Sequence, residues 1–280
     1  MPSLLPSDTV DVPPERVLLV IDMKGYSQMS EMSMAPTRAA LDAILATSFT
    51  QCGIGDVSTL ENAVKDRGDG AIFVLPARHA ARLVDPFLDN LRQALERYER
   101  TRPAGASRLR LRASVHVGPL TAPAYRGDAV NDACRLVDSK QVYQAMAAAT
   151  DHELPLAVVL SDPVFRRAVR AGRTATLQPR HFLRATACVD GKAEFEETCW
   201  LFVPGLVPTA LSSYLAADDA TALERREDGV LQRAATDAAR EEREPSVSMR
   251  GRASGKARLI QVGRDYVEGR HQSEPLNPPE

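Results

Sequence analysis

Two acidic side chains stand where the backbone of this chain is expected to turn sharply. Asp22 follows the apolar run 16–21, which is rich in β-branched residues and predicts a buried strand. Asp69 is the middle residue of a Gly-Asp-Gly triplet at 68–70, which is typical of a hairpin turn. Carboxylate oxygens are preferred ligands of hard divalent cations. We therefore expect Asp22 and Asp69, at the ends of neighbouring strands, to hold one or two Mg²⁺ or Mn²⁺ ions.

A third segment, Asp128 to Val137, has the pattern of a helix, and Asp128 is suited to be its N-cap. Asn131 and Arg135 are four residues apart and therefore share one helix face. A neutral amide suits the hydroxyls of a ribose, and a guanidinium suits a charged phosphoryl group. Divalent cations neutralise a triphosphate and polarise an attacking oxygen, so the three segments together fit chemistry on a nucleoside triphosphate.

The elements that must position these residues follow from hydrophobic periodicity. Helices are predicted at 37–49, 80–98, 128–137 and 162–170, and strands at 16–21, 63–64, 71–75, 109–117, 156–160 and 194–203. The order is β-α-β-β-α-β with later additions, which predicts a ferredoxin-like α+β domain. Many unrelated functions use this arrangement, so the fold alone assigns none of them.

Length and charge limit the remaining function classes. The 280 residues suffice for one domain of roughly 150–200 residues and an additional segment. The net charge of −2 gives no electrostatic case for nucleic-acid or membrane binding, and no apolar run approaches the roughly 20 residues of a membrane span. The four cysteines are far apart in the sequence, which favours free thiols in a reducing cytoplasm over a zinc site or disulfides.

Four segments, in this order, resemble the class III adenylyl and guanylyl cyclases. They are Asp-x-x-Gly-Tyr-Ser at 22–27, Lys-x-x-Gly-Asp-Gly at 65–70, Val-His-Val-Gly-Pro at 115–119 and Gly-Asp-x-Val-Asn-x-Ala-x-Arg-Leu at 127–136. The resemblance covers about residues 15–205. It implies a catalytic domain that closes a nucleoside triphosphate into a 3′,5′-cyclic mononucleotide and releases pyrophosphate.

The resemblance also implies a role for each matching residue. Asp22 and Asp69 correspond to the ligands of two divalent cations, Mn²⁺ or Mg²⁺. Asn131 corresponds to the residue that orients the ribose, and Arg135 to the one that stabilises charge on the phosphates. Lys65 occupies the position that reads the base. In this family the aspartates come from one chain and the Lys, Asn and Arg from the other, so a homodimer with composite sites is implied.

Several positions depart from the family pattern. The second base-reading residue, seven positions before the ribose-binding asparagine, is here Ala124, whose side chain makes no hydrogen bond. The phosphate-binding lysine of the last strands has only an offset candidate, Lys192. Asp66 and Arg67 are unusual before the glycine of the hairpin. Tyr26 can stack on a base, although a packing role fits it better.

Ala124 bears on the identity of the substrate. A base site altered in this way resembles the pyrimidine cyclases of bacterial anti-phage (Pycsar) systems, so we favour UTP and a cyclic UMP signal. The alternative is an ordinary adenylate cyclase, which Lys65 favours and Ala124 opposes. A third hypothesis is a catalytically silent cyclase-like module that binds nucleotide and signals through its tail. The third hypothesis is opposed by the presence of all four expected residues, Asp22, Asp69, Asn131 and Arg135.

The ends of the chain differ in composition from the middle. Residues 1–14 are expected to be a disordered lead-in, and 206–280 a charged helix or linker with a tail. Within the tail, an apolar island at 259–267 contains Ile260-Gln261-Val262-Gly263, which resembles the core of RHIM-like amyloid signalling motifs. The island predicts either pairing with an effector that shares the motif or a short strand that folds back on the domain.

Overall fold

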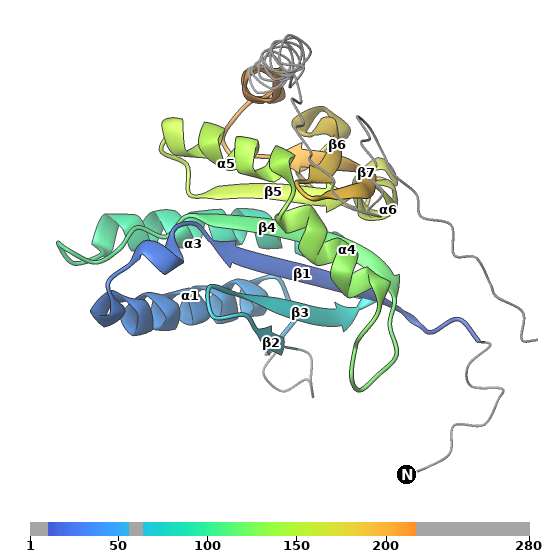
Figure 1. Cartoon of the computed structure of the whole chain (residues 1–280), viewed down its shortest axis with the longest axis horizontal. Helices are drawn as coiled ribbons and strands as arrows, with labels where there is room; N and C mark the ends of the chain where they lie inside the picture. Colours follow the sequence, from blue (N-terminus) through green and yellow to red (C-terminus); the bar gives the residue numbers. More distant parts are fainter. Residues whose placement is uncertain (1–10, 56–63, 217–280) are drawn as a thin grey trace, which may run out of the picture. The chain divides into compact units, whose positions relative to one another are not determined.

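The computed structural model describes residues 11–55 and 64–216, and within them a seven-stranded sheet has helices on both faces (Figure 1). The strands lie side by side in the order β2-β3-β1-β4-β5-β7-β6. Their bounds are β1 Glu15–Met23, β2 Val64–Asp66, β3 Gly70–Pro76, β4 Leu111–Pro119, β5 Leu156–Ser161, β6 Leu183–Val189 and β7 Lys192–Phe202. The helices are α1 Glu31–Gln51, α2 Ala80–Val84, α3 Phe87–Thr101, α4 Asp128–Val137, α5 Lys140–Asp151 and α6 Asp162–Phe165.

The first four strands and their helices form the predicted βαββαβ unit. β1 lies between β3 and β4 and is antiparallel to both, and β2 extends this group as the antiparallel partner of β3. β5 adds to the other side, parallel to β4, and the β6–β7 hairpin completes the sheet. The ferredoxin-like α+β prediction is therefore confirmed.

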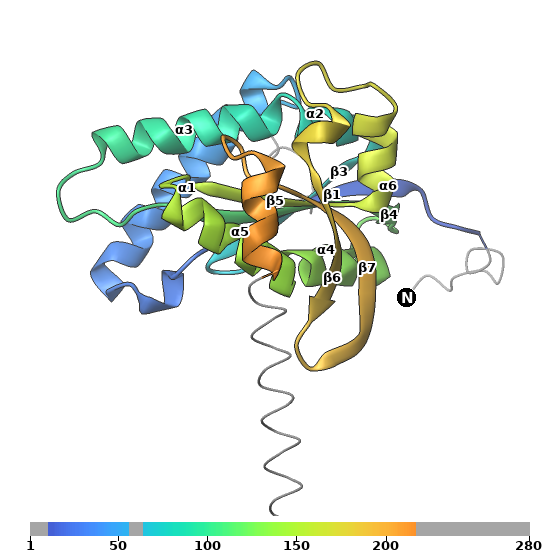
Figure 2. The same ribbon diagram turned by 90° about the horizontal axis from the view of Figure 1, so that it is seen from above.

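β1 is buried on both faces, and its alternating side chains separate two cores. Val17, Leu19 and Ile21 pack with α1, α2 and α3 on one face, whereas Leu18 and Val20 pack against α4 on the other. Figure 2 shows α1 and α3 on one side of the sheet, with α4 and α5 on the opposite side. Because side chains alternate along a strand, the even-numbered positions of β1, including Asp22, belong to the α4 face.

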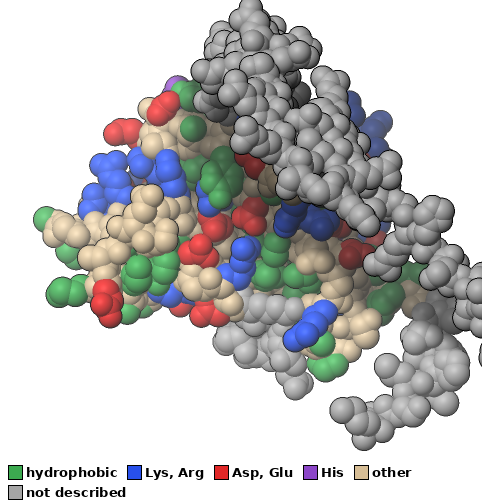
Figure 3. All heavy atoms as spheres, in the orientation of Figure 1, with side chains coloured by type: hydrophobic (Ala, Val, Ile, Leu, Met, Phe, Trp, Pro, Cys, Tyr) green, Lys and Arg blue, Asp and Glu red, His purple; other side chains and the backbone are tan. Residues whose placement is uncertain are grey.

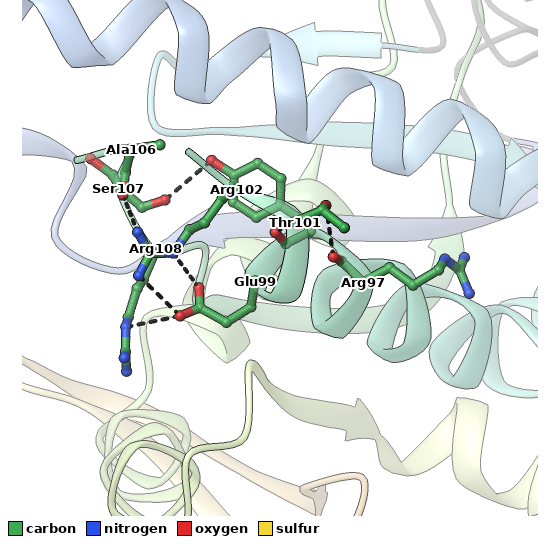
Figure 4. A network of polar contacts seen from close by, with 8 residues as sticks. Arg97, Glu99, Thr101, Arg102, Ala106, Ser107 and Arg108 are labelled. Atoms are coloured by element: carbon green, nitrogen blue, oxygen red, sulfur yellow. Dashed lines mark hydrogen bonds and ion pairs between the residues drawn. The ribbon is translucent and has the colours of Figure 1, made fainter. Parts of the chain in front are cut away.

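A polar network fixes the loop that leads into β4. The guanidinium groups of Arg102 and Arg108 both pair with Glu99, and Arg102 also donates to the carbonyl oxygen of Ala106 at 2.6 Å (Figure 4). The hydroxyl of Tyr98 donates to the carbonyl oxygen of Ser107 at 3.2 Å. These contacts tie the end of α3 to the chain entering β4.

Some boundaries differ from the predictions. The single helix predicted at 80–98 is wrong: it is broken at Asp85 and Pro86 into α2 and α3, because proline has no N–H to continue a helix. The N-cap of α4 is Gly127, and Asp128 lies in the first turn instead. The helix predicted at 162–170 consists of α6 followed by a π-helical turn, and β6 and α5 were not predicted.

The predicted terminal segments are only partly described. Residues 208–216 form a helix at the start of the predicted linker. The apolar island at 259–267, with its Ile260-Gln261-Val262-Gly263 motif, lies outside the described residues, as do residues 1–10. Within 11–55 and 64–216, no helix combines the length and apolar character needed to cross a bilayer.

Candidate active site

Asp22 lies near the carboxyl end of β1, and its side chain is 8% exposed. Its neighbours across the sheet are Gly70 of β3 and Arg112 of β4. Figure 3 shows acidic side chains near the centre of the face that is turned to the viewer in Figure 1, with Lys and Arg side chains beside them. The carboxylate is thus held at a fixed point of the sheet rather than on a free loop.

The glycine that follows Asp69 explains how the hairpin reaches Asp22. A Cβ on Gly70 would lie 1.9 Å from the carbonyl oxygen of Ile21, so only glycine lets β3 approach β1 this closely. The amide of Met23 donates to the carbonyl oxygen of Asp69 at 2.9 Å and fastens the turn to the strand end. The close backbone approach at Gly70 therefore explains why the Asp69 turn lies next to the strand end that carries Asp22.

The electrostatics of Asp22 reflect this neighbourhood. Burial raises the pKa of its carboxyl group, Arg112 opposes that rise, and the negative charges of Asp69 and Asp138 add to it. Two carboxylates that repel each other in a partly desolvated place form an oxygen donor set that a hard divalent cation satisfies. The residues present thus fit a cation held by Asp22 and Asp69. Among the described residues, no cluster of three or more His, Cys, Asp or Glu side chains could hold a metal ion.

Arg112 is a site residue that the sequence analysis missed. Its guanidinium is hydrogen-bonded to the carboxylate of Asp22, its side chain is buried, and it lies 3.8 Å from the centre of the Tyr143 ring. The sequence predicts a strand at 109–117, and an arginine in such a strand is expected to face solvent. Only the register of β4 against β1 places Arg112 opposite Asp22 and inside the site.

α4 carries Asn131 and Arg135 on a face that is at least partly open to solvent. Small residues allow the helix to pack closely, since a Cβ on Gly118 would lie 2.7 Å from the Cβ of Ala129. Asn131 is exposed, and Arg135 is half-buried, with an ion pair to Asp132 at 3.3 Å. The predicted shared face of the helix is therefore accessible to a ligand.

Arg135 faces an open groove with a volume of about 580 Å³, which Gly191, Lys192, Glu194 and Phe195 also line. The guanidinium carbon of Arg135 is 5.4 Å from the centre of the Phe195 ring. The structure therefore brings together Arg135 and Lys192, two residues that the resemblance assigns to phosphate. Neither Asp22 nor Asp69 lines this groove, so one chain carries two separate groups of site residues.

The remaining predicted residues occupy different places. The backbone of Lys65 lies in β2 opposite Ile72, and Ala124 lies in an exposed turn before α4. Tyr26 begins a short 3₁₀ helix, Tyr26–Gln28, and its ring packs against the core on the α1 face. Because Asp22 belongs to the α4 face, this position supports packing rather than base stacking for Tyr26.

No family model and no curated protein matches the sequence. Similar solved structures are catalytic domains of cyclases. The adenylate/guanylate cyclase/hydrolase from Silicibacter pomeroyi shares 20% identity, with a TM-score of 0.47 over 69% of this chain and 98% of that chain. The guanylate cyclase domain of RhGC from Catenaria anguillulae, in complex with GTP, shares 16% identity, with a TM-score of 0.45 over 69% and 97%. For the adenylyl cyclase CyaB from P. aeruginosa the values are 12%, 0.41, 67% and 93%.

Proposed function

We propose that residues 15–205 form the catalytic domain of a metal-dependent nucleotidyl cyclase. The observation that carries the proposal is the close approach at Gly70, which places the Asp69 turn against the strand end that bears Asp22. A buried carboxylate beside a second carboxylate is costly unless a positive charge offsets it. Arg112 offsets one of the two negative charges, and divalent cations held there would offset the other and bind the phosphates of the substrate.

The proposed reaction joins the ribose 3′-oxygen to the α-phosphorus and breaks the bond from that phosphorus to pyrophosphate, while the hydroxyl proton passes to water. Cations bound by Asp22 and Asp69 would neutralise the phosphates and make the 3′-hydroxyl easier to deprotonate. Asn131 would hold the ribose, and Arg135 and Lys192 would stabilise the charge that develops on the leaving group. No dedicated protein base is required.

The separation of the two groups of residues supports a homodimer with shared sites. Asp22 and Asp69 lie at the end of β1, whereas Arg135 and Lys192 line a different groove of the same chain. A second copy in two-fold arrangement can set the groove of one chain opposite the aspartates of the other. We therefore place one complete site at each of two symmetric positions.

For the substrate we favour UTP, because Ala124 removes a side chain with which a purine would be read. A cyclic UMP product would fit a signal in bacterial anti-phage defence, and the island at 259–267 would fit an effector partner. The second candidate is an adenylate cyclase, which is favoured by Lys65 at the position that reads the base in the family motif.

Product analysis tests the proposal directly. The purified protein is incubated with ATP, GTP, CTP or UTP and Mn²⁺, and products are identified by mass spectrometry. We expect cyclic UMP from UTP, and none from Asp69→Ala. Cyclic AMP as the main product would remove the pyrimidine preference. No cyclic nucleotide from any of the four would remove the cyclase assignment.

A further inference from the structure

The turn that carries Asp69 is held by hydrogen bonds from Arg38 of α1. Arg38 lies within that helix, and its side chain is only 18% exposed. Its Nη1 atom lies 2.8 Å from Oδ1 of Asp66, 2.9 Å from the carbonyl oxygen of Gly68 and 3.0 Å from that of Gly70. One guanidinium therefore contacts the residue on each side of Asp69 as well as the strand residue before the turn.

Further hydrogen bonds within the turn and along the helix stabilise this arrangement. Oδ1 of Asp66 also accepts a hydrogen bond from the amide of Gly68 at 2.8 Å, and the amide of Arg67 donates to the carbonyl oxygen of Gly70 at 3.0 Å. On the helix, Nε of Arg38 donates to Asp42 at 3.0 Å, which orients the guanidinium plane. Asp66, which departs from the family pattern, thus has a structural task.

The hydrogen bonds from Arg38 fix the position of the Asp69 backbone on one side, and the hydrogen bond from the Met23 amide fixes it on the other. A ligand carboxylate binds a cation well only when its backbone is already in place, because ordering a loop on binding costs affinity. A lysine would replace this arginine only in part, since an ammonium keeps the charge but lacks the planar, multiply donating fork.

We infer that Arg38, acting through Asp66 and the carbonyl groups of Gly68 and Gly70, is the positioning residue that prepares Asp69 for a divalent cation. The inference rests on the proposed function and assigns it a residue outside the family motifs. Arg38 bonds to Asp42, Asp66, Gly68 and Gly70, so its effect must appear first in cation affinity.

The test is a titration of the full chain with Mn²⁺ in the absence of nucleotide, in which electron paramagnetic resonance measures the free Mn²⁺ at each step. Loss of an outer partner of a metal ligand typically weakens metal binding by roughly 10–100-fold. We expect a loss in this range for Arg38→Gln, and only partial rescue by Arg38→Lys. Amide hydrogen exchange at 67–70 should become faster in both variants, and saturating Mn²⁺ should restore most turnover.

A matched control removes a comparable arginine elsewhere. Arg92 on α3 pairs with Asp89 at 2.8 Å and Glu96 at 2.6 Å, and Arg92→Gln should leave Mn²⁺ affinity unchanged. If Arg38→Gln does not fold, Asp66→Ala serves instead, because that side chain is 72% exposed and its loss spares the core.

The outcomes separate this inference from the proposed function. If Asp69→Ala loses Mn²⁺ binding while Arg38→Gln and Asp66→Ala bind as the wild type does, Arg38 has no positioning role and the cyclase proposal stands. If Asp69→Ala binds Mn²⁺ as the wild type does, or the wild type binds none, the metal site fails and the role of Arg38 fails with it. Weakened binding in Arg38→Gln with an unchanged Arg92→Gln supports the inference.

Discussion

Replacing Gly70 with alanine tests whether the close approach of β3 to β1 builds the site. The added Cβ would lie 1.9 Å from the carbonyl oxygen of Ile21 and 2.9 Å from its carbonyl carbon, whereas real Cβ atoms keep at least 3.0 Å from other atoms. The obstacle is backbone and cannot rotate away, so the turn has to retreat by about 1.1 Å. Overpacking of this kind costs about 1–3 kcal/mol of unfolding free energy.

The same retreat should separate Asp69 from Asp22. Because metal ligands must lie within a few tenths of an ångström of their required positions, we expect Gly70→Ala to weaken Mn²⁺ binding by at least about tenfold. Urea unfolding gives the stability change, and electron paramagnetic resonance gives the affinity.

A second glycine supplies the matched control. Gly172 has a φ of +67°, and a Cβ added there would meet nothing within 4 Å. Gly172→Ala should therefore cost about 1–2 kcal/mol through backbone strain alone and leave Mn²⁺ affinity unchanged. If Gly70→Ala matches the wild type in both stability and Mn²⁺ affinity, the close approach does not organise the site.

Three further predictions concern charge and assembly. Arg112→Ala leaves Asp22 buried without its partner, so we expect urea unfolding at pH 8 to show a loss of about 3–5 kcal/mol in unfolding free energy. The loss should shrink as pH falls, because burial raises the pKa of Asp22 and protonation removes the unpaired charge. An equal loss at all pH values would contradict this. Burial lowers the pKa of His116 below its ordinary 6.5, so the unfolded chain binds more protons and thermal stability should fall as pH drops below about 6.5. His116→Gln should flatten that decline, and an unaltered pH profile would show that His116 does not cause it. Mixing Asp69→Ala with Arg135→Ala chains should restore turnover through one intact site per mixed dimer, whereas inactive mixed dimers would exclude a shared site.

Local patterns predicted much of the framework because they depend on neighbours along the chain. The apolar run before Asp22, the Gly-Asp-Gly turn and the i,i+4 spacing of Asn131 and Arg135 each follow from the conformation of a few consecutive residues. Such patterns gave the ferredoxin-like order of elements and α4 with its bounds. The hairpin strand β6 escaped prediction because its alternation is carried by alanines, which signal a strand weakly.

By itself, then, the sequence determined which residue types stand at strand ends, turns and one helix face, since backbone preferences and side-chain periodicity are local. Only the tertiary structure decided what those residues meet. The register of β4 against β1 brought Arg112 onto Asp22, the packing of α1 brought Arg38 under the Asp69 turn, and the β6–β7 hairpin brought Lys192 beside Arg135. These contacts join segments distant in sequence, and they depend on how sheet and helices pack together, which no local pattern encodes.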